Sequence, residues 1–166
     1  DSGTYFQTLP LKSRALDPAS TLSVDGSALS AGTDWSASGS GELTNPALGV
    51  VYGGMLGDTT VTLTPEQVAG KLVVFEFPAT RRGRFARPPA GAAATAIVSD
   101  QLLGSFRRPS VFVDDPARPA PARQASAPTI FLTSAAAGRL FAAPLDQMQA
   151  GDAGQAVPVD IRLAVT

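Results

Sequence analysis

The sequence predicts a β-rich α+β fold: a sandwich or open barrel of short strands with two or three short flanking helices. The chain of 166 residues contains 16 glycines and 14 prolines, which favours frequent turns and disfavours long helices. Short segments in which polar and apolar residues alternate recur along it, as expected of strands with one buried face. We therefore expect a single domain over residues 1–166, with lead-in strands and a connector over 1–47 and the main core over 48–166.

The first 47 residues contain one clear hairpin signal. Thr21–Val24 alternates polar and apolar residues, and the Asp25-Gly26 pair that follows is a favoured two-residue hairpin turn. The return strand is expected to begin at Ala28. Residues 32–41 are small, polar and rich in turn formers, so we predict a loop in which Trp35 anchors the chain to the core or its rim.

Strand signals become stronger after residue 47. The run KLVVFEF at 71–77 is continuously apolar apart from its charged positions and predicts a buried central strand. The other strands are expected at 48–52, 59–63, 95–98, 110–113, 129–132 and 157–165.

Two helices carry recognisable caps. Thr64 is a predicted N-cap, followed by Pro65 at the first helical position and Gln67 at the capping-box position. Thr133 or Ser134 is expected to cap a second helix that runs to about residue 142. Single turns are predicted at 89–94 and 144–148.

The residues that are absent exclude several functions. The chain has no His and no Cys, so Ser-His-Asp and Cys-His catalysis are excluded, and a zinc site within it is not expected. The only lysines, Lys12 and Lys71, are not in a Ser-x-x-Lys spacing. A net charge of −1 gives no reason to expect nucleic-acid binding, and no segment is long and apolar enough to span a membrane. We predict no catalytic residue, metal or cofactor in this chain.

The order of the motifs resembles the protease-associated (PA) domain, over roughly residues 48–163. The matching segments are Gly49-Val-Val-Tyr-Gly-Gly54, Val68-Ala-Gly-Lys-Leu-Val-Val74, the Gly91-Ala-Ala93 segment, Ala96-Ile-Val98, and Ala127-Pro-Thr-Ile130 leading into the capped helix. In addition, Tyr5-Phe-Gln7 followed by Leu9-Pro-Leu11 looks like the segment that precedes the PA domain in M28-type zinc aminopeptidases. PA domains of subtilisin-like proteases remain an alternative.

The resemblance implies a non-catalytic accessory domain of a secreted or periplasmic metallopeptidase. In such enzymes the zinc belongs to a separate catalytic domain, which would be the partner of this chain, together with a peptide or protein substrate. The domain would modulate substrate access or mediate protein and peptide contacts. One departure is that PA domains carry a regular helix before the Gly-Ala segment, whereas here residues 84–89 include two prolines that would shorten or remove it.

An arginine cluster is the most distinctive chemical feature, with Arg81, Arg82, Arg84 and Arg87 in one segment and Arg107 and Arg108 in a later one. Arg binds carboxylates with two parallel hydrogen bonds, so the cluster could bind an acidic partner or the carboxylate of a peptide. The simpler interpretation is a solvated charged loop, which most charge runs are.

Other candidates have simpler explanations. Gly53, Gly54 and Gly57 lack phosphate-loop spacing and are expected to serve a strand end and a turn. The Asp114-Asp115 pair is too small a set of oxygen ligands for calcium. Glu76, within the apolar strand, is expected either to have a partner such as an Arg or to point to solvent near the strand end.

Two further functions are compatible with the sequence. Exposed aromatic residues in a row would favour an independent domain that binds carbohydrate or a cell-surface ligand. Aromatic residues make up only 7% of the chain and are scattered along it, which counts against this function. A hydrolase that works without His would need converging Ser, Lys and Asp side chains, and no motif indicates them.

Overall fold

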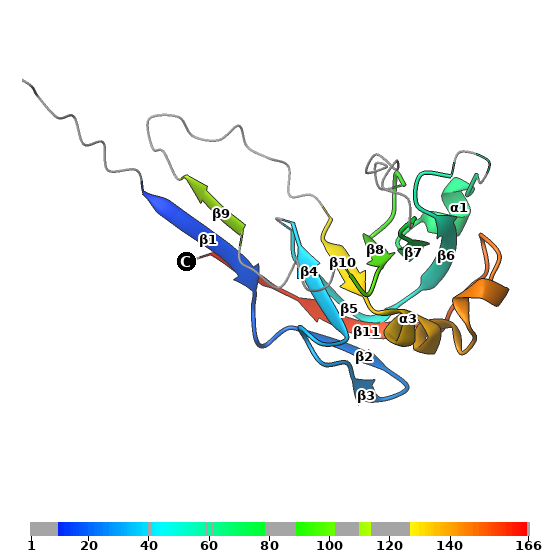
Figure 1. The fold of residues 1–166 in the computed structure, drawn as a ribbon, viewed down its shortest axis with the longest axis horizontal. Coiled ribbons are helices and arrows are strands. Elements are labelled where there is room, and N and C mark those ends of the chain that lie inside the picture. The colour runs from blue at the N-terminus through cyan, green and yellow to red at the C-terminus, as the bar shows by residue number, and fades with distance from the viewer. Residues whose placement is uncertain are drawn as a thin grey trace, which may run out of the picture.

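The computed structural model describes residues 10–39, 41–58, 60, 62–78, 89–101, 110–113 and 127–165. Three sheets, with few and short helices, make up this part of the chain (Figure 1). The strands are β1 Leu11–Leu16, β2 Thr21–Val24, β3 Ser27–Ala28, β4 Trp35–Ser38, β5 Leu43–Leu48, β6 Val50–Met55, β7 Leu72–Glu76, β8 Ala94–Val98, β9 Ser110–Val113, β10 Thr129–Leu132, β11 Val157–Ile161 and β12 Leu163–Val165. The helices are α1 Pro65–Val68, α3 Ser134–Phe141 and the 3-10 turn η1 Leu145–Gln147.

The central sheet has five strands in the order β4-β10-β8-β7-β6. The last four of these are mutually parallel, and only β4 is antiparallel to its neighbour. A second, four-stranded sheet has the order β3-β2-β11-β5. In the third sheet β1 is central, between β12 and β9; we call this the terminal sheet, because it contains the first and last described strands.

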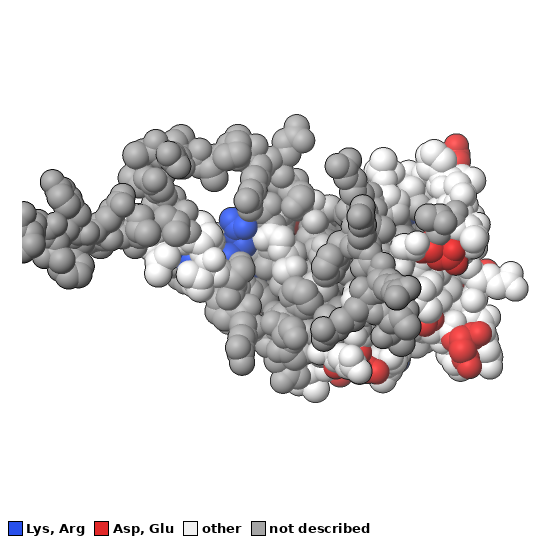
Figure 2. All heavy atoms as spheres, turned by 45° about the horizontal axis from the view of Figure 1, so that its top comes forward, with Lys and Arg blue, Asp and Glu red and all other residues white. Residues whose placement is uncertain are grey.

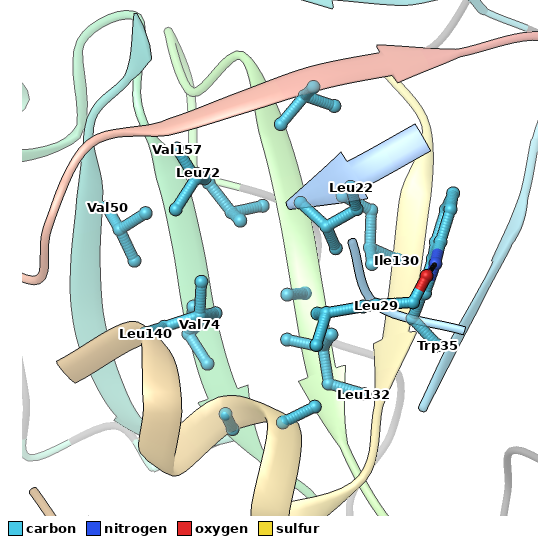
Figure 3. Close-up of a cluster of buried hydrophobic side chains, with 14 of the residues drawn as sticks. Leu22, Leu29, Trp35, Val50, Leu72, Val74, Ile130, Leu132, Leu140 and Val157 are labelled. Carbon is cyan, nitrogen blue, oxygen red and sulfur yellow. Dashed lines mark hydrogen bonds between the residues drawn. The ribbon is translucent and has the colours of Figure 1, made fainter. Parts of the chain in front are cut away.

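The main core lies between the central sheet and the four-stranded sheet, with α3 closing one side. Figure 3 shows labelled side chains of both sheets and Leu140 of α3 pointing into the same space. These layers are compatible with a β sandwich, and the prediction of a β-rich fold with few helices is confirmed. The fully buried large side chains include Leu22, Trp35, Leu48, Leu72, Ile130, Leu132, Leu140 and Ile161.

The sequence signals located several elements correctly. β2 coincides with the predicted strand, and Asp25 and Gly26 both have positive φ angles of 53° and 72°, as the two-residue hairpin to β3 requires. β7 occupies most of the predicted run 71–77 and lies between β6 and β8. Its first three residues are buried, because both faces of the sheet are covered there.

The two capped helices are also confirmed. Thr64 accepts a hydrogen bond from the Gln67 backbone, and the Gln67 side chain accepts one from the Thr64 backbone, which completes the capping box of α1. The Thr133 side chain caps α3 by accepting from Ala136 N at 3.2 Å. The helix buries Leu140 and two alanines against the core.

Residues 32–47 contain two strands that the sequence did not indicate. The segment predicted as a loop around Trp35 forms β4, an edge strand of the central sheet, and the residues before Leu48 form β5. Trp35 is fully buried, as predicted for a core anchor, and its Nε1 donates to the Leu29 carbonyl at 3.2 Å. Strands from residues 1–47 therefore pair with strands from 48–166 in all three sheets.

Four predicted segments differ from the structure. In the strand predicted at 59–63, the described residues 60, 62 and 63 are outside regular structure and precede Thr64, the N-cap of α1. The run at 48–52 is divided by Gly49 into the end of β5 and the start of β6, and the run at 157–165 is divided at Arg162. A hydrogen-bonded turn replaces the helical turn expected at 89–94, with Ala92 N donating to the Pro89 carbonyl, and Ala94 already begins β8.

The outer face of the central sheet, opposite the main core, carries a second apolar cluster. Leu56, Ile97 and Phe131 are buried there, with Phe75 and Phe77 packed against them. Gly53 makes room for this cluster, because a Cβ at that position would overlap the Phe75 ring. The β6–β7 register shifts between Tyr52 and Gly54, so Gly53 sits in an irregularity of the edge strand.

Candidate functional site

The candidate site is the edge of the central sheet at which the parallel strands β7 and β8 end. Glu76 at the end of β7 is the register partner of Val98 at the end of β8. Residues 79–88 follow β7 in the sequence, and residues 102–109 follow β8. Both arginine-containing segments of the sequence therefore begin at neighbouring strand ends, which the spacing of the arginines alone does not reveal.

The arginines themselves lie outside the described residues. The same holds for Asp114 and Asp115, and for residues 84–88 of the segment in which the two prolines were expected to shorten a helix. The predicted binding residues in this group are Arg81, Arg82, Arg84, Arg87, Arg107 and Arg108.

Among the described residues, the partner of Glu76 at this edge is a tyrosine. The Tyr52 hydroxyl donates to Glu76 Oε1 at 2.7 Å, from the neighbouring strand β6. Tyr52 is 6% exposed, and its ring packs edge-on against Phe141 at the end of α3, with 5.8 Å between ring centroids. Burial raises the pKa of the Tyr52 phenol, and the hydrogen bond to Glu76 and the charge of this carboxylate raise it further.

We expect replacement of Tyr52 by Phe to lower the free energy of unfolding by about 1–2 kcal/mol at pH 8, because Glu76 loses its partner. The stability that comes from the raised phenol pKa is present below about pH 10, the pKa of an unperturbed tyrosine. It is lost as the pH rises further, because the phenol then ionises more readily in the unfolded chain than in the folded one. Urea unfolding of the unmodified protein and of Tyr52→Phe is measured between pH 8 and 11. The difference between their free energies of unfolding should become smaller above pH 10. A difference that stays constant over this range would contradict the assignment.

Asp100 organises the neighbouring strand end. Its two carboxylate oxygens accept from the backbone N and the hydroxyl of Ser134, each at 2.9 Å, and so join the end of β8 to the start of α3. Thr133 N donates to the Asp34 carbonyl at 3.0 Å, which fixes the same helix start to the loop before β4. These hydrogen bonds connect the end of β8 to the start of α3 and to the loop before β4, next to the position where residues 102–109 begin.

A shallow depression of about 510 Å³ lies along the outer side of α3. Most of its lining consists of small side chains, with Asp25 and Arg139 as the charged groups. Arg139 is already used in the fold, because its guanidinium donates to the Val24 carbonyl at 3.3 Å. The remaining lining residues are Ser134, Ala135, Gly138, Ala142, Ala143 and Pro144.

Two of the three glycines near the end of β6 have the conformational role predicted for them. Gly54 and Gly57 both have φ angles of 84°, which glycine adopts without strain, at the end of the strand and in the following turn. Gly53 is required by close packing instead. In the described ranges, no cluster of three or more His, Cys, Asp or Glu could hold a metal ion, and no helix is long and apolar enough to cross a membrane.

Neither a scan against protein-family models nor a search of curated proteins gave a match. Among solved structures, the chain is similar to the aminopeptidase from Aneurinibacillus sp. strain AM-1, at 15% sequence identity and a TM-score of 0.46. The similarity covers 96% of this chain and 36% of the aminopeptidase, so the chain spans about a third of the length of that protein.

Proposed function

We propose that this chain is a non-catalytic accessory domain of a secreted M28-type zinc aminopeptidase, in which it modulates access of substrates or mediates peptide and protein contacts. The observation that carries the proposal is the antiparallel pairing of the first described strand with the last. Arg14 is opposite Val165, and Leu16 is opposite Leu163. A domain whose two ends lie side by side can be inserted into another domain with little disturbance of either.

The motif order over residues 48–163 supports the same proposal. The segments on which the resemblance to the PA domain rests form a connected unit here: β6, β7, β8 and β10 are consecutive neighbours in the central sheet, and α3 follows β10 directly. Zinc and the catalytic residues are assigned to a separate domain of the parent enzyme, because this chain contains no His and no Cys to bind the metal.

We assign the contact with substrate or partner to the edge where β7 and β8 end. Six arginines occur in the two segments that begin there, at 79–88 and 102–109, and each can bind a carboxylate with two hydrogen bonds. A peptide presents such a group at its C-terminus. The edge is formed by paired strands and by the hydrogen bonds of Glu76 and Asp100, and binding residues are often positioned by such a scaffold.

The test is a deletion in the parent polypeptide. Residues 11–165 are replaced by a short Gly-Ser linker, which the pairing of β1 with β12 makes feasible, and kcat/KM is measured for an aminoacyl anilide and for longer peptides. We expect hydrolysis of the anilide to persist, while the ratio of kcat/KM for long over short substrates changes about ten-fold, or ~1.4 kcal/mol. A variant with Arg81, Arg82, Arg84 and Arg87 changed to Ala should show part of the same change.

Two results would contradict the proposal. One is a parent polypeptide without aminopeptidase activity. The other is a deletion variant whose substrate preference and activity equal those of the intact enzyme. If only the arginine variant behaves like the intact enzyme, the accessory role stands and the assignment to the arginines is wrong.

A further inference from the structure

The outer edge of β6 is covered by a segment that lies outside the named strands. Residues 149–154, which we call the edge segment, follow η1 and lie beside β6 (Figure 1). Ala153 is the antiparallel partner of Val51. Three backbone hydrogen bonds join the two segments: Tyr52 N to the Asp152 carbonyl at 2.8 Å, Gly151 N to the Tyr52 carbonyl at 2.8 Å, and Gly154 N to the Val50 carbonyl at 2.9 Å. The edge segment therefore pairs with β6 in the manner of an added strand.

Main-chain hydrogen bonds, and not buried side chains, hold the edge segment in place. None of its residues is buried, and Asp152 and Ala153 are exposed. The segment also contains a turn of its own, in which Asp152 Oδ2 accepts from Gln149 N and Asp152 N donates to the Gln149 carbonyl, each at 2.9 Å. Segments with few buried apolar contacts open at a low cost in free energy, and this one can leave β6 with its turn intact.

Both ends of the edge segment are fixed to the body of the domain. On one side, Leu145 of η1 packs against the main core. On the other side, Gln155 N donates to the Leu140 carbonyl at 3.1 Å, and Gln155 Nε2 donates to the Arg139 carbonyl at 2.8 Å. Opening is therefore confined to the residues that pair with β6 and does not require α3 or η1 to move.

Opening exposes the main-chain groups that an extended peptide would bind. Tyr52 N and the carbonyls of Val50 and Tyr52 lose their partners, and unpaired backbone groups at the edge of a sheet are a template for another strand. A peptide that adds at this edge makes hydrogen bonds of the same kind, so the exchange preserves the pairing of β6. Tyr52 also connects this edge to the candidate site, because its hydroxyl donates to Glu76.

Three exposed carboxylates lie in the edge segment or on the elements next to it: Glu66 on α1, Asp146 on η1 and Asp152 in the segment itself. Helix α1 is close to the segment, since a Cβ at Gly151 would lie 2.7 Å from Gln67 Nε2. Figure 2 shows most of the acidic side chains in view toward the end of the molecule that carries α1 and η1 in Figure 1. A peptide with Lys or Arg side chains is therefore attracted to this edge more strongly than an acidic one.

We infer that the edge of β6 is a binding site for an extended, basic segment of a peptide substrate, and that the edge segment occupies this site until the peptide displaces it. The inference rests on the proposed function, because the peptide is the substrate of the proposed parent peptidase. The peptide pairs through its main chain with Val50 and Tyr52, at a distance from the bond that the parent cleaves. Without peptide, the edge segment keeps this edge of the sheet from pairing with other chains.

A disulfide between the edge segment and β6 tests the inference, since the chain contains no Cys of its own. Val51 and Ala153 form a pair whose neighbours make the hydrogen bonds, and the Cα atoms of such a pair are about 4.5 Å apart, a distance that a disulfide can span. The double variant Val51→Cys/Ala153→Cys is made in the parent polypeptide and assayed when oxidised and after treatment with a phosphine reductant. The unmodified parent receives the same treatments as a control.

Two substrates with the same lysine-containing sequence are compared, each a peptide of about ten residues, long enough to add a strand. One is unmodified, and the other is N-methylated at its fourth to eighth residues, which removes the N–H donors that strand pairing needs. Release of the first residue is measured for both. In the reduced double variant, kcat/KM should be about ten-fold higher for the unmodified peptide, and the disulfide should remove most of this ratio.

Asp152→Ala should change the same ratio in the opposite direction. The substitution removes the Oδ2 acceptor that closes the turn of the edge segment, so the segment leaves β6 more readily. The ratio of kcat/KM for the unmodified over the N-methylated peptide should rise about two- to three-fold above that of the unmodified parent. Asp152→Asn is the matched control, because it removes the charge and retains an acceptor, and its ratio should equal that of the parent.

The outcomes separate this inference from the proposed function. Equal ratios in the oxidised and reduced double variant overturn the inference, even if the deletion alters substrate preference as proposed. If the parent polypeptide has no peptidase activity, hydrogen exchange at 149–154 is measured by mass spectrometry with each peptide added. Faster exchange with the unmodified peptide alone identifies the edge as a peptide-binding site and overturns its assignment to a substrate. Exchange that neither peptide changes overturns the inference altogether.

Discussion

Replacement of Trp35 by Ala should lower the free energy of unfolding by about 3–5 kcal/mol, the typical cost of removing a large aromatic side chain from a packed core. The Trp35 side chain is fully buried, and both Trp35 and Leu29 belong to the main core. The substitution leaves a cavity and also removes the donor to the Leu29 carbonyl. For a domain of this size, the melting temperature should fall by about 6–20 °C.

The measurement is thermal and urea unfolding followed by circular dichroism. Trp35→Phe should cost less than Trp35→Ala, because most of the apolar volume remains and only the N–H donor is lost. Met55→Ala, at an exposed position, should change stability by no more than about 0.5 kcal/mol. A loss below about 1 kcal/mol for Trp35→Ala would show that β4 is not an integral part of the central sheet.

Gly53→Ala is expected to cost about 1–3 kcal/mol, through overpacking and not through backbone strain. Gly53 does not have a positive φ, so alanine is compatible with its backbone conformation. The new Cβ would instead overlap the Phe75 ring, which is held in the cluster on the outer face of the central sheet. Either the ring or strand β6 must therefore move.

A double-mutant cycle isolates this cause. In a Phe75→Ala background the ring is absent, so Gly53→Ala should cost much less, which gives a coupling energy of about 1 kcal/mol or more. Gly49→Ala is the matched control on the same edge of the sheet, because its Cβ would meet only the flexible Lys71 side chain, at 3.3 Å. Equal costs at Gly53 with and without the ring would refute the packing explanation.

Local sequence signals predicted the elements whose structure is set by neighbouring residues. The Asp25-Gly26 turn, the Thr64 capping box and the run at 71–77 are each specified within a few residues, and all three are confirmed. Strand β4 was missed because Ser36, Ala37 and Ser38 are small and lie in a segment that is rich in turn-forming residues. Their burial comes from the antiparallel pairing with β10, which is more than 90 residues away in the sequence and leaves no local trace.

The same reason limits what the sequence reveals of the candidate site. Tyr52 and Glu76 are 24 residues apart, and Asp100 and Ser134 are 34 apart, so no spacing rule connects them. The arginines were recognisable as a charged cluster from the sequence alone. The parallel pairing of β7 with β8 is what makes their two segments begin at adjacent strand ends, and the sequence does not reveal this pairing. The pairing of β1 with β12 is likewise non-local, although it carries the proposed function.

The measurement that tests the proposed function most directly is the metal content and peptidase activity of the 166-residue chain purified alone. We predict that it contains no stoichiometric zinc and cleaves none of a panel of aminoacyl anilides and peptides, with or without added zinc. Stoichiometric metal, or hydrolysis that co-purifies with the chain, would contradict a non-catalytic role. The catalytic groups would then have to be sought among its serines, its two lysines and its carboxylates.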